Sequence, residues 1–172
     1  AGRRAAHAAL RELGAPEGPL LQTAGGDVAW PVGWTGSITH TASWCLAAVA
    51  STSCCRNLGL DLEEIRRMTV PVARRILLPE EQEQAENAAE PFLHRAALLF
   101  SAKEALYKTV ASWMTPPPGF RDVRLAVDGT GALRHLRAEL VPPQAKQADR
   151  IAALRGFGTF CGTFSLAAFY EM

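Results

Sequence analysis

The 172-residue sequence lacks three features, each of which would point to a particular class of protein. It has no apolar run long enough to span a bilayer and no signal-peptide pattern at its start, so we expect a cytoplasmic protein without a membrane partner. Its net charge is only +1, and it has no extended basic stripe, which argues against a nucleic-acid-binding protein. Its four cysteines have neither zinc-ligand spacing nor a secretory context, so we expect reduced thiols.

The composition that is present is ordinary for a globular protein, with 48% hydrophobic and 20% charged residues. This length allows one sizeable core or two small subdomains that share one. The chain opens at Ala1 in a helical pattern without Met, so we expect some native sequence to precede it.

Hydrophobic periodicity predicts an α+β protein whose helices and strands alternate in groups. The acidic segment at 58–64 is expected to form a hairpin with the strand before it, which would bring His40 near Asp61. Helices are expected to begin near Thr69 and Pro79. The expected long elements are a helix at 3–13, strands at 36–41 and 44–50, a helix at 92–113, and strands at 120–127, 132–141 and 157–170.

The acidic segment places two carboxylates inside an otherwise apolar run, Gly-Leu-Asp-Leu-Glu-Glu at 59–64. In an extended strand, Asp61 and Glu63 project from one face while Leu60 and Leu62 face a core. Neighbouring carboxylates that stay ionised usually hold a cation, and oxygen ligands favour a hard ion such as Mg²⁺. An edge strand with a solvated polar face would give the same pattern, so this segment alone does not establish a metal site.

A second acidic motif lies on the longest helical pattern. Glu104 and Lys108 are four residues apart and share a helix face, with Lys103 beside them. A helix-stabilising ion pair would explain this spacing by itself. However, these residues, together with Asp61, Glu63 and His40, are the polar groups embedded in the most apolar parts of the chain, where unpaired burial is costly. A shared site for a metal and a polyanion would satisfy them all.

Three motifs in this order closely resemble the 4'-phosphopantetheinyl transferases, and within that superfamily the Sfp/EntD type. They are Trp30-Pro31 with Gly36-Ser37-Ile38-Thr39-His40, then Gly59-Leu60-Asp61-Leu62-Glu63-Glu64-Ile65, then Phe100-Ser101-Ala102-Lys103-Glu104-Ala105-Leu106-Tyr107-Lys108. The resemblance implies two pseudo-symmetric α/β subdomains with antiparallel sheets, each packed with a long helix, and an active site at their interface. We place these subdomains at residues 1–70 and 71–172.

The resemblance also implies a reaction. These enzymes move the 4'-phosphopantetheine group of coenzyme A to a serine of an apo acyl or peptidyl carrier protein and release adenosine 3',5'-bisphosphate. It implies a need for Mg²⁺, for which Mn²⁺ would substitute, and a role in secondary metabolite biosynthesis. Two subdomains in one chain make a monomer sufficient. The native carrier protein stays open among those of fatty acid, polyketide, peptide and siderophore synthesis.

Individual roles follow from the matched positions. Asp61, Glu63 and Glu104 would hold the metal, and Glu104 would take the proton from the carrier serine. Lys108 would stabilise the pyrophosphate and donate to the departing bisphosphate. The other residues that would contact coenzyme A are His40, Thr39, Lys103, Arg3 and Arg4. Glu81 matches a further acidic position of the family, although a first-turn helix residue favoured by the helix dipole would look the same.

A mixed basic and apolar stretch after the acidic segment is expected to bind the carrier protein, because carriers present an acidic and partly apolar helix beside their serine. Its residues are Arg66, Arg67, Met68, Arg74, Arg75 and Leu77. A solvated helix with its apolar side in the core would give the same composition.

Two other functions remain open. A Mg²⁺-dependent nuclease or phosphotransfer enzyme would also combine acids with a lysine, but the nucleases usually place that Glu and Lys two apart on a strand. A module of the same fold could instead bind coenzyme A or a carrier without turnover.

Overall fold

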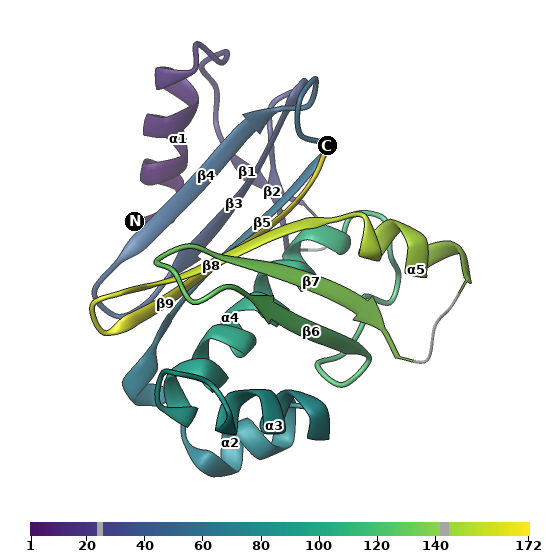
Figure 1. Cartoon of the computed structure of the whole chain (residues 1–172). Coiled ribbons are helices and arrows are strands. Elements are labelled where there is room, and N and C mark those ends of the chain that lie inside the picture. Colours follow the sequence, from purple (N-terminus) through teal and green to yellow (C-terminus); the bar gives the residue numbers. More distant parts are fainter. Residues whose placement is uncertain (24–25, 142–144) are drawn as a thin grey trace.

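The larger half of the fold is a five-stranded antiparallel sheet in the order β5-β9-β8-β7-β6 (Figure 1). The computed structural model describes residues 1–23, 26–141 and 145–172. Helix α4 (Phe92–Val110) packs along β5 and β9 and buries Leu99 and Leu106 in the main core. The strands of this sheet are β5 Asn57–Glu64, β6 Val123–Asp128, β7 Arg134–Leu140, β8 Arg155–Cys161 and β9 Phe164–Glu171.

The smaller half pairs one helix with a two-stranded sheet. Helix α1 packs against β4 and β3, and its Ala6 and Leu10 form a small core with Leu20. The predicted α+β architecture with antiparallel sheets is therefore confirmed. The elements of this half are α1 Gly2–Glu12, β1 Leu21–Gln22, β2 Val28–Ala29, β3 Trp34–His40 and β4 Cys45–Ser51.

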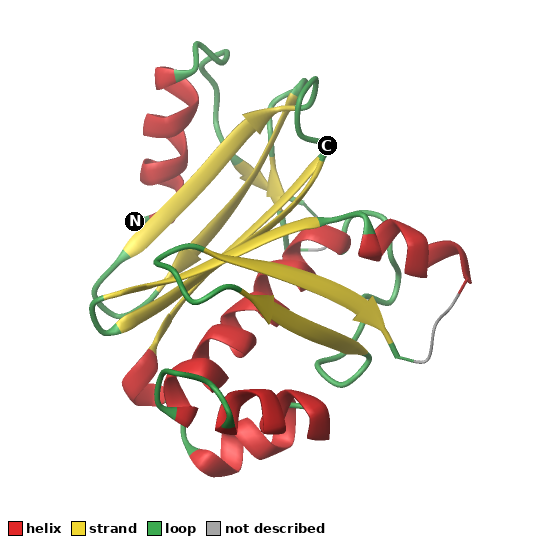
Figure 2. Ribbon diagram, in the orientation of Figure 1, coloured by secondary structure: helices red, strands yellow, loops and turns green. Residues whose placement is uncertain are grey.

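Short helices fill the connection between β5 and α4, as Figure 2 shows. They are the 3-10 helix η1 Ile65–Arg67, α2 Val70–Ile76 and α3 Pro79–Glu86. The predicted helix starts at Thr69 and Pro79 are confirmed, with a proline in the first turn of each. A further helix, α5 (Ala145–Ala152), lies in a part of the chain for which the sequence predicted mostly strand. Within the described ranges, no helix combines the length and the apolarity needed to cross a membrane.

Two side-chain hydroxyls join the two halves. Strands β3 and β5 belong to different sheets, but Ser37 Oγ accepts a hydrogen bond from the amide of Leu60 at 2.9 Å. Thr39 Oγ1 accepts one from the amide of Leu62 at 3.2 Å. These hydroxyls satisfy amide groups that a neighbouring backbone would satisfy in a regular sheet. We call this contact the hydroxyl seam.

The backbone pairing differs from the predicted hairpin. Strand β5 pairs with β9 along its whole length, from Asn57 opposite Glu171 to Glu64 opposite Phe164, and β4 pairs with β3. The expected hairpin between β4 and β5 is therefore wrong, because the partner of β5 lies about a hundred residues later in the sequence. The predicted boundary at residue 70 falls after β5, whereas hydrogen bonding groups β5 with the C-terminal strands.

Gly59 lets α4 lie directly on β5. A Cβ at this position would overlap the carbonyl oxygen of Ala105 and the hydroxyl of Thr109 on the helix. The Thr109 hydroxyl is itself within hydrogen-bonding distance of Ala105 O and Phe169 O, at 2.8 and 3.1 Å. The helix backbone therefore sits against β5 and β9 at a distance that only glycine permits, and this brings the polar residues of α4 close to those of β5.

We expect Gly59→Ala to destabilise the protein by about 1–3 kcal/mol or more, because the added methyl group must push α4 away from the sheet. Urea denaturation measures the loss in the free energy of unfolding. Gly18→Ala is the matched control, because a Cβ at that position meets open space and should change stability by less than about 0.5 kcal/mol. Equal stability of the two variants would contradict this account of Gly59.

Candidate active site

Asp61 lies in the middle of β5 and is buried, with only 4% of its surface exposed. One carboxylate oxygen, Oδ1, accepts hydrogen bonds from Thr39 Oγ1 of β3 at 3.1 Å and from Lys108 Nζ of α4 at 2.7 Å. The same ammonium donates to the carbonyl of Leu60 at 3.1 Å, and Ser101 Oγ donates to the carbonyl of Asp61 at 3.0 Å. Asp61 therefore joins β5 to both the smaller half and the long helix.

The second carboxylate oxygen of Asp61 lacks hydrogen bonds of the kind that the first oxygen accepts. Oδ2 is buried and has no hydrogen-bond partner among the described residues. Burial of an unpaired carboxylate oxygen is costly, and buried polar atoms of native proteins are normally paired. A donor or a cation supplied from outside the chain would therefore bind favourably at this oxygen.

Glu63 and Glu104 surround Asp61 with further negative charge. Burial, the charge of Asp61 and the charge of Glu104 together raise the pKa of Glu63 to about 7. Burial and the charge of Asp61 also raise the pKa of Glu104, while the ammonium of Lys108 opposes this shift. The three acids that the sequence singled out therefore share one electrostatic neighbourhood, although they come from two elements more than forty residues apart.

The three acids are not arranged as a complete set of metal ligands. In the described ranges, no group of three or more His, Cys, Asp or Glu side chains is arranged so that it could hold a metal ion. Instead, Lys108 supplies the positive charge beside Asp61. The predicted metal ligands are near one another without forming a ligand set, so a Mg²⁺ site remains a prediction.

Lys103 points to the opposite side of α4 from Lys108. Its ammonium forms an ion pair with Glu81 Oε1 at 2.9 Å and donates to the carbonyls of Phe120 and Val123. All three ammonium protons have partners within the protein, so none is available to coenzyme A, but Lys103 also lines the first of the two cavities described below. Its predicted contact with coenzyme A therefore stays a prediction. Glu81 is 1% exposed and faces the same interior, so its possible role as a site residue finds no support in its position.

Of the four remaining predicted ligand contacts, three are exposed near the ends of elements and Thr39 is buried. His40 is exposed at the end of β3, next to Thr39, whose hydroxyl already contacts Asp61. Arg3 and Arg4 are exposed on α1. The structure brings only Thr39 of these four residues into contact with the acidic cluster.

The predicted carrier-binding stretch divides into surface and core. Its four arginines are exposed, whereas Met68 and Leu77 are 6% and 0% exposed and belong to the main core. The assignment of these two residues to a docking surface is therefore wrong, because each directly follows a short helix, η1 or α2, and packs into the main core. Val70 and Val72 are 41% exposed and provide the apolar part of this surface instead.

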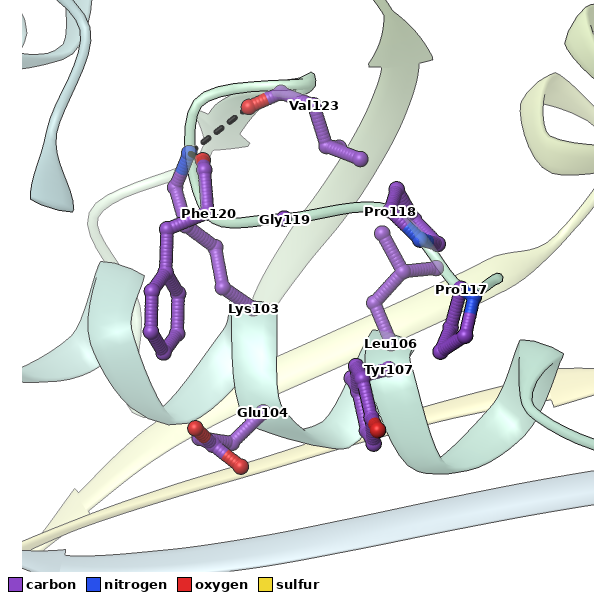
Figure 3. Close-up of a pocket in the computed structure, with 9 residues that line it drawn as sticks. All are labelled: Lys103, Glu104, Leu106, Tyr107, Pro117, Pro118, Gly119, Phe120 and Val123. Atoms are coloured by element: carbon purple, nitrogen blue, oxygen red, sulfur yellow. Dashed lines mark hydrogen bonds between the residues drawn. The ribbon is translucent and has the colours of Figure 1, made fainter. Parts of the chain in front are cut away.

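Two cavities lie on either side of Tyr107. The first, of about 230 Å³, is mainly apolar and lies between α4 and the loop before β6 (Figure 3). The second, of about 330 Å³, lies between β3, the start of β5 and the end of α4. Glu104 lines the first cavity, Lys108 lines the second, and Tyr107 lines both.

Sequence reasoning missed most of the cavity walls. Pro117 and Pro118 have no role in the sequence-based prediction, Phe120 was expected to begin a strand at 120–127, and Asn57 and Ser112 were not singled out. The position of Tyr107 beside Lys108 in the third motif was the signal available for this region. The loop itself carries no local signal of its contact with α4.

Comparisons with known proteins match nearly the whole chain. The model of the 4'-phosphopantetheinyl transferase N-terminal domain matches residues 1–50, and that of the 4'-phosphopantetheinyl transferase superfamily matches residues 57–155. The 4'-phosphopantetheinyl transferase Svp of Streptomyces mobaraensis is 38% identical over 73% of this chain and 52% of its own length. PptT of Mycobacterium tuberculosis is 34% identical over 75% of this chain and 58% of its own length.

A third relative is enterobactin synthase component D of Salmonella typhi, which is 32% identical over 87% of this chain and 63% of its own length. The chain thus spans little more than half to under two thirds of the length of these relatives. Among solved structures, holo-[acyl-carrier-protein] synthase of Thermotoga maritima superposes with a TM-score of 0.50 at 19% identity, over 66% of this chain and 61% of that one. This likeness concerns the fold alone.

The raised pKa of Glu63 predicts a pH dependence of stability in the metal-free protein. Its pKa is 4.5 in the unfolded chain and about 7 in the folded one, so the folded state binds more protons between these values. The contribution of Glu63 to the free energy of unfolding is therefore largest below about pH 4.5 and is lost as the pH rises through about 7. We expect Glu63→Gln to remove this fall, measured by urea denaturation at pH 5 and pH 8 with a chelator present.

Glu12→Gln is the control, because Glu12 is exposed on α1 and this variant should keep the wild-type pH dependence. An equal fall in the free energy of unfolding between pH 5 and pH 8 in Glu63→Gln and the wild type would contradict the raised pKa of the half-buried Glu63 carboxylate.

Proposed function

Because the chain belongs to the 4'-phosphopantetheinyl transferase superfamily, we propose that it transfers the 4'-phosphopantetheine group of coenzyme A to a serine of an apo carrier protein. Adenosine 3',5'-bisphosphate is the other product. The observation that carries this proposal is the position of Glu104 and Lys108 around Tyr107, with one residue in each of two adjacent cavities and both beside Asp61.

The two cavities suit the two ends of coenzyme A. This molecule consists of a phosphorylated adenosine and an arm of amides and methylenes, joined through a pyrophosphate. The larger cavity offers the polar side chains of Thr35, Asn57 and Ser112 to the nucleotide. The smaller cavity, with its apolar walls, suits the arm. The pyrophosphate would then lie near Tyr107, within reach of the Lys108 ammonium.

Lys108 would hold the phosphates of the substrate and of the product. In the free protein its ammonium neutralises Asp61, and its side chain is still 29% exposed. A phosphate oxygen that approaches from the second cavity would find a donor already held in place by Asp61 and the Leu60 carbonyl. His40 and Thr39 at the end of β3, with Arg3 and Arg4 on α1, are the further candidates for phosphate contact.

The acidic cluster fits a divalent cation in its chemistry. Asp61, Glu63 and Glu104 offer carboxylate oxygens, including the unpaired Oδ2 of Asp61, and these are the ligands that Mg²⁺ and Mn²⁺ prefer. When bound, such a cation would neutralise the charge that develops on the pyrophosphate. We propose these three residues as the ones that would hold it.

Glu104 is the proposed general base. Burial and the neighbouring carboxylate raise its pKa, so it accepts a proton more readily near neutral pH than an exposed glutamate does. It lines the first cavity, where the arm and the carrier serine would meet. Its carboxylate would take the hydroxyl proton as the serine oxygen attacks the phosphorus atom.

The carrier protein would bind over η1 and α2. This surface combines Val70 and Val72 with four exposed arginines, and it directly follows the acidic strand β5 in the chain. Arg66 is oriented by Glu64 at 2.8 Å. An acidic helix of the carrier, with apolar residues on one side, complements this combination. The basic residues are Arg66, Arg67, Arg74 and Arg75.

We expect Glu104→Gln to lower the transfer rate by at least about 100-fold while the protein remains folded, because the amide cannot accept the proton. Incubation with coenzyme A, Mg²⁺ and an apo carrier, followed by mass spectrometry of the carrier, measures the reaction. Glu83→Gln, an exposed change on α3, is the control and should leave the rate unchanged.

Wild-type protein that binds coenzyme A calorimetrically but adds no phosphopantetheine mass would overturn the proposed reaction in favour of a binding module. Degradation of nucleic acid without such addition would favour a nuclease.

We expect Arg74→Glu together with Arg75→Glu to raise the KM for the carrier protein about tenfold or more and to leave the KM for coenzyme A unchanged. The reason is that reversed charge repels an acidic carrier helix but lies outside both cavities. Steady-state kinetics with each substrate varied in turn separates the two effects. Arg11→Glu together with Arg155→Glu is the control of equal charge change at exposed sites elsewhere. Equal effects of the two pairs would remove this docking surface.

A further inference from the structure

A buried ion pair joins α3 and α4 on the side of α4 that faces away from Asp61. The side chains of Lys103 and Glu81 are 2% and 1% exposed, and Lys103 Nζ lies 2.9 Å from Glu81 Oε1. Placing both charges out of water carries a large desolvation penalty, which lowers the pKa of Lys103 despite the adjacent carboxylate. Apolar residues of similar volume would fill the same space at a lower cost, so the pair calls for an explanation beyond packing.

The contacts of the pair reach four separate segments. Glu81 accepts hydrogen bonds from the amide of Leu78, at the start of α3, and from the amide of Leu125 in β6, each at 2.8 Å. Lys103 extends from α4 and donates to the carbonyl of Val123 at 2.6 Å and to that of Phe120. All three protons of the ammonium and both oxygens of the carboxylate are thus used for contacts within the protein.

The carbonyls held by Lys103 belong to a wall of the first cavity. Pro117, Pro118, Gly119 and Phe120 line this cavity opposite the α4 residues, and Figure 3 shows the Lys103 ammonium pointing toward this loop. In the same view the carboxylate of Glu104 points away from Lys103, although the two residues are adjacent in sequence. The loop connects the end of α4 to β6, so its distance from α4 sets the width of the cavity.

We propose that Lys103 and Glu81 are positioning residues that fix the outer wall of the first cavity at the width required by the pantetheine arm. The inference rests on the proposed function, because it takes the arm as the occupant of this cavity. Glu81 lies outside both cavities, and Lys103 lines the first one, but its ammonium is bound within the protein and offers no proton to the substrate. Lys103 acts through the carbonyls of Phe120 and Val123, and Glu81 acts by holding Lys103 and β6 together.

The test replaces the pair by neutral residues of similar shape, Lys103→Met with Glu81→Gln. We expect the KM for coenzyme A to rise about tenfold, because the loop loses its two ammonium contacts and the cavity changes width. Two fragments of coenzyme A, used as inhibitors, show which part of the molecule binds more weakly. The inhibition constant of 4'-phosphopantetheine, which contains the arm, should rise by a similar factor, whereas that of adenosine 3',5'-bisphosphate, which lacks the arm, should change by less than about twofold.

The matched control is Arg124→Met with Glu80→Gln. This pair also joins β6 to α3, at 3.2 Å, but its side chains are 42% and 58% exposed and lie outside both cavities. We expect all three constants to stay within about twofold of the wild type. A purely structural role for the buried pair would instead move both inhibition constants together or lower only the melting temperature, and either result would overturn the proposal.

Glu81→Gln alone decides the question if the double variant does not fold, because Lys103 then keeps its two carbonyl contacts. It should show the same selective loss for the arm-containing fragment to a smaller degree, and an unselective effect would overturn the proposal. If the wild type transfers no phosphopantetheine, the proposed function fails separately. The dissociation constants of the two fragments, measured by calorimetry, then test the positioning role by the same comparison.

Discussion

The contact on which the fold and the candidate site both depend is the one between Asp61 and Lys108. The carboxylate is buried in β5, and its Oδ1 receives the Lys108 ammonium from α4 and the Thr39 hydroxyl from β3. One side chain thus connects the five-stranded sheet, the helix that covers it and the smaller half of the molecule. The same side chain retains an unpaired buried oxygen, so the group that holds the halves together also has capacity for an external ligand.

The sequence predicted the local features of this arrangement because they follow from short-range geometry. The two-residue spacing of Asp61 and Glu63 places both acids on one side of a strand, and the four-residue spacing of Glu104 and Lys108 places both on one side of a helix. The pairing of strands that lie far apart in the sequence could not be predicted from such spacings. The partner of β5 is β9, so a rule based on neighbouring segments assigned the wrong strand. The ion pair of Lys108 with Asp61, rather than with Glu104, likewise depends on the close approach that Gly59 permits.

Adjacent residues of one motif serve different parts of the molecule. Lys103 and Glu104 follow each other in the third motif, but successive residues of a helix are about 100° apart around its axis. Lys103 consequently faces Glu81 in the interior, while Glu104 faces the acidic cluster. In the predicted carrier-binding stretch, Met68 and Leu77 are likewise buried, whereas Arg74 and Arg75 between them are exposed. The composition shows that these stretches contain both charged and apolar residues. The direction of each side chain decides whether it faces the core, the acidic cluster or the solvent.

The hydroxyl seam limits the substitutions that the chain tolerates between β3 and β5. Hydrogen bonds between the backbones of two strands form almost regardless of the side chains, so most sheets accept substitutions along their ladders. Between β3 and β5 the contact depends instead on Ser37 and Thr39. Recombining one half of this protein with the other half of a distant homologue would therefore require these two hydroxyl groups to be inherited with the N-terminal piece. The contact between the two halves is thus specified by the side chains at two positions rather than by backbone hydrogen bonds.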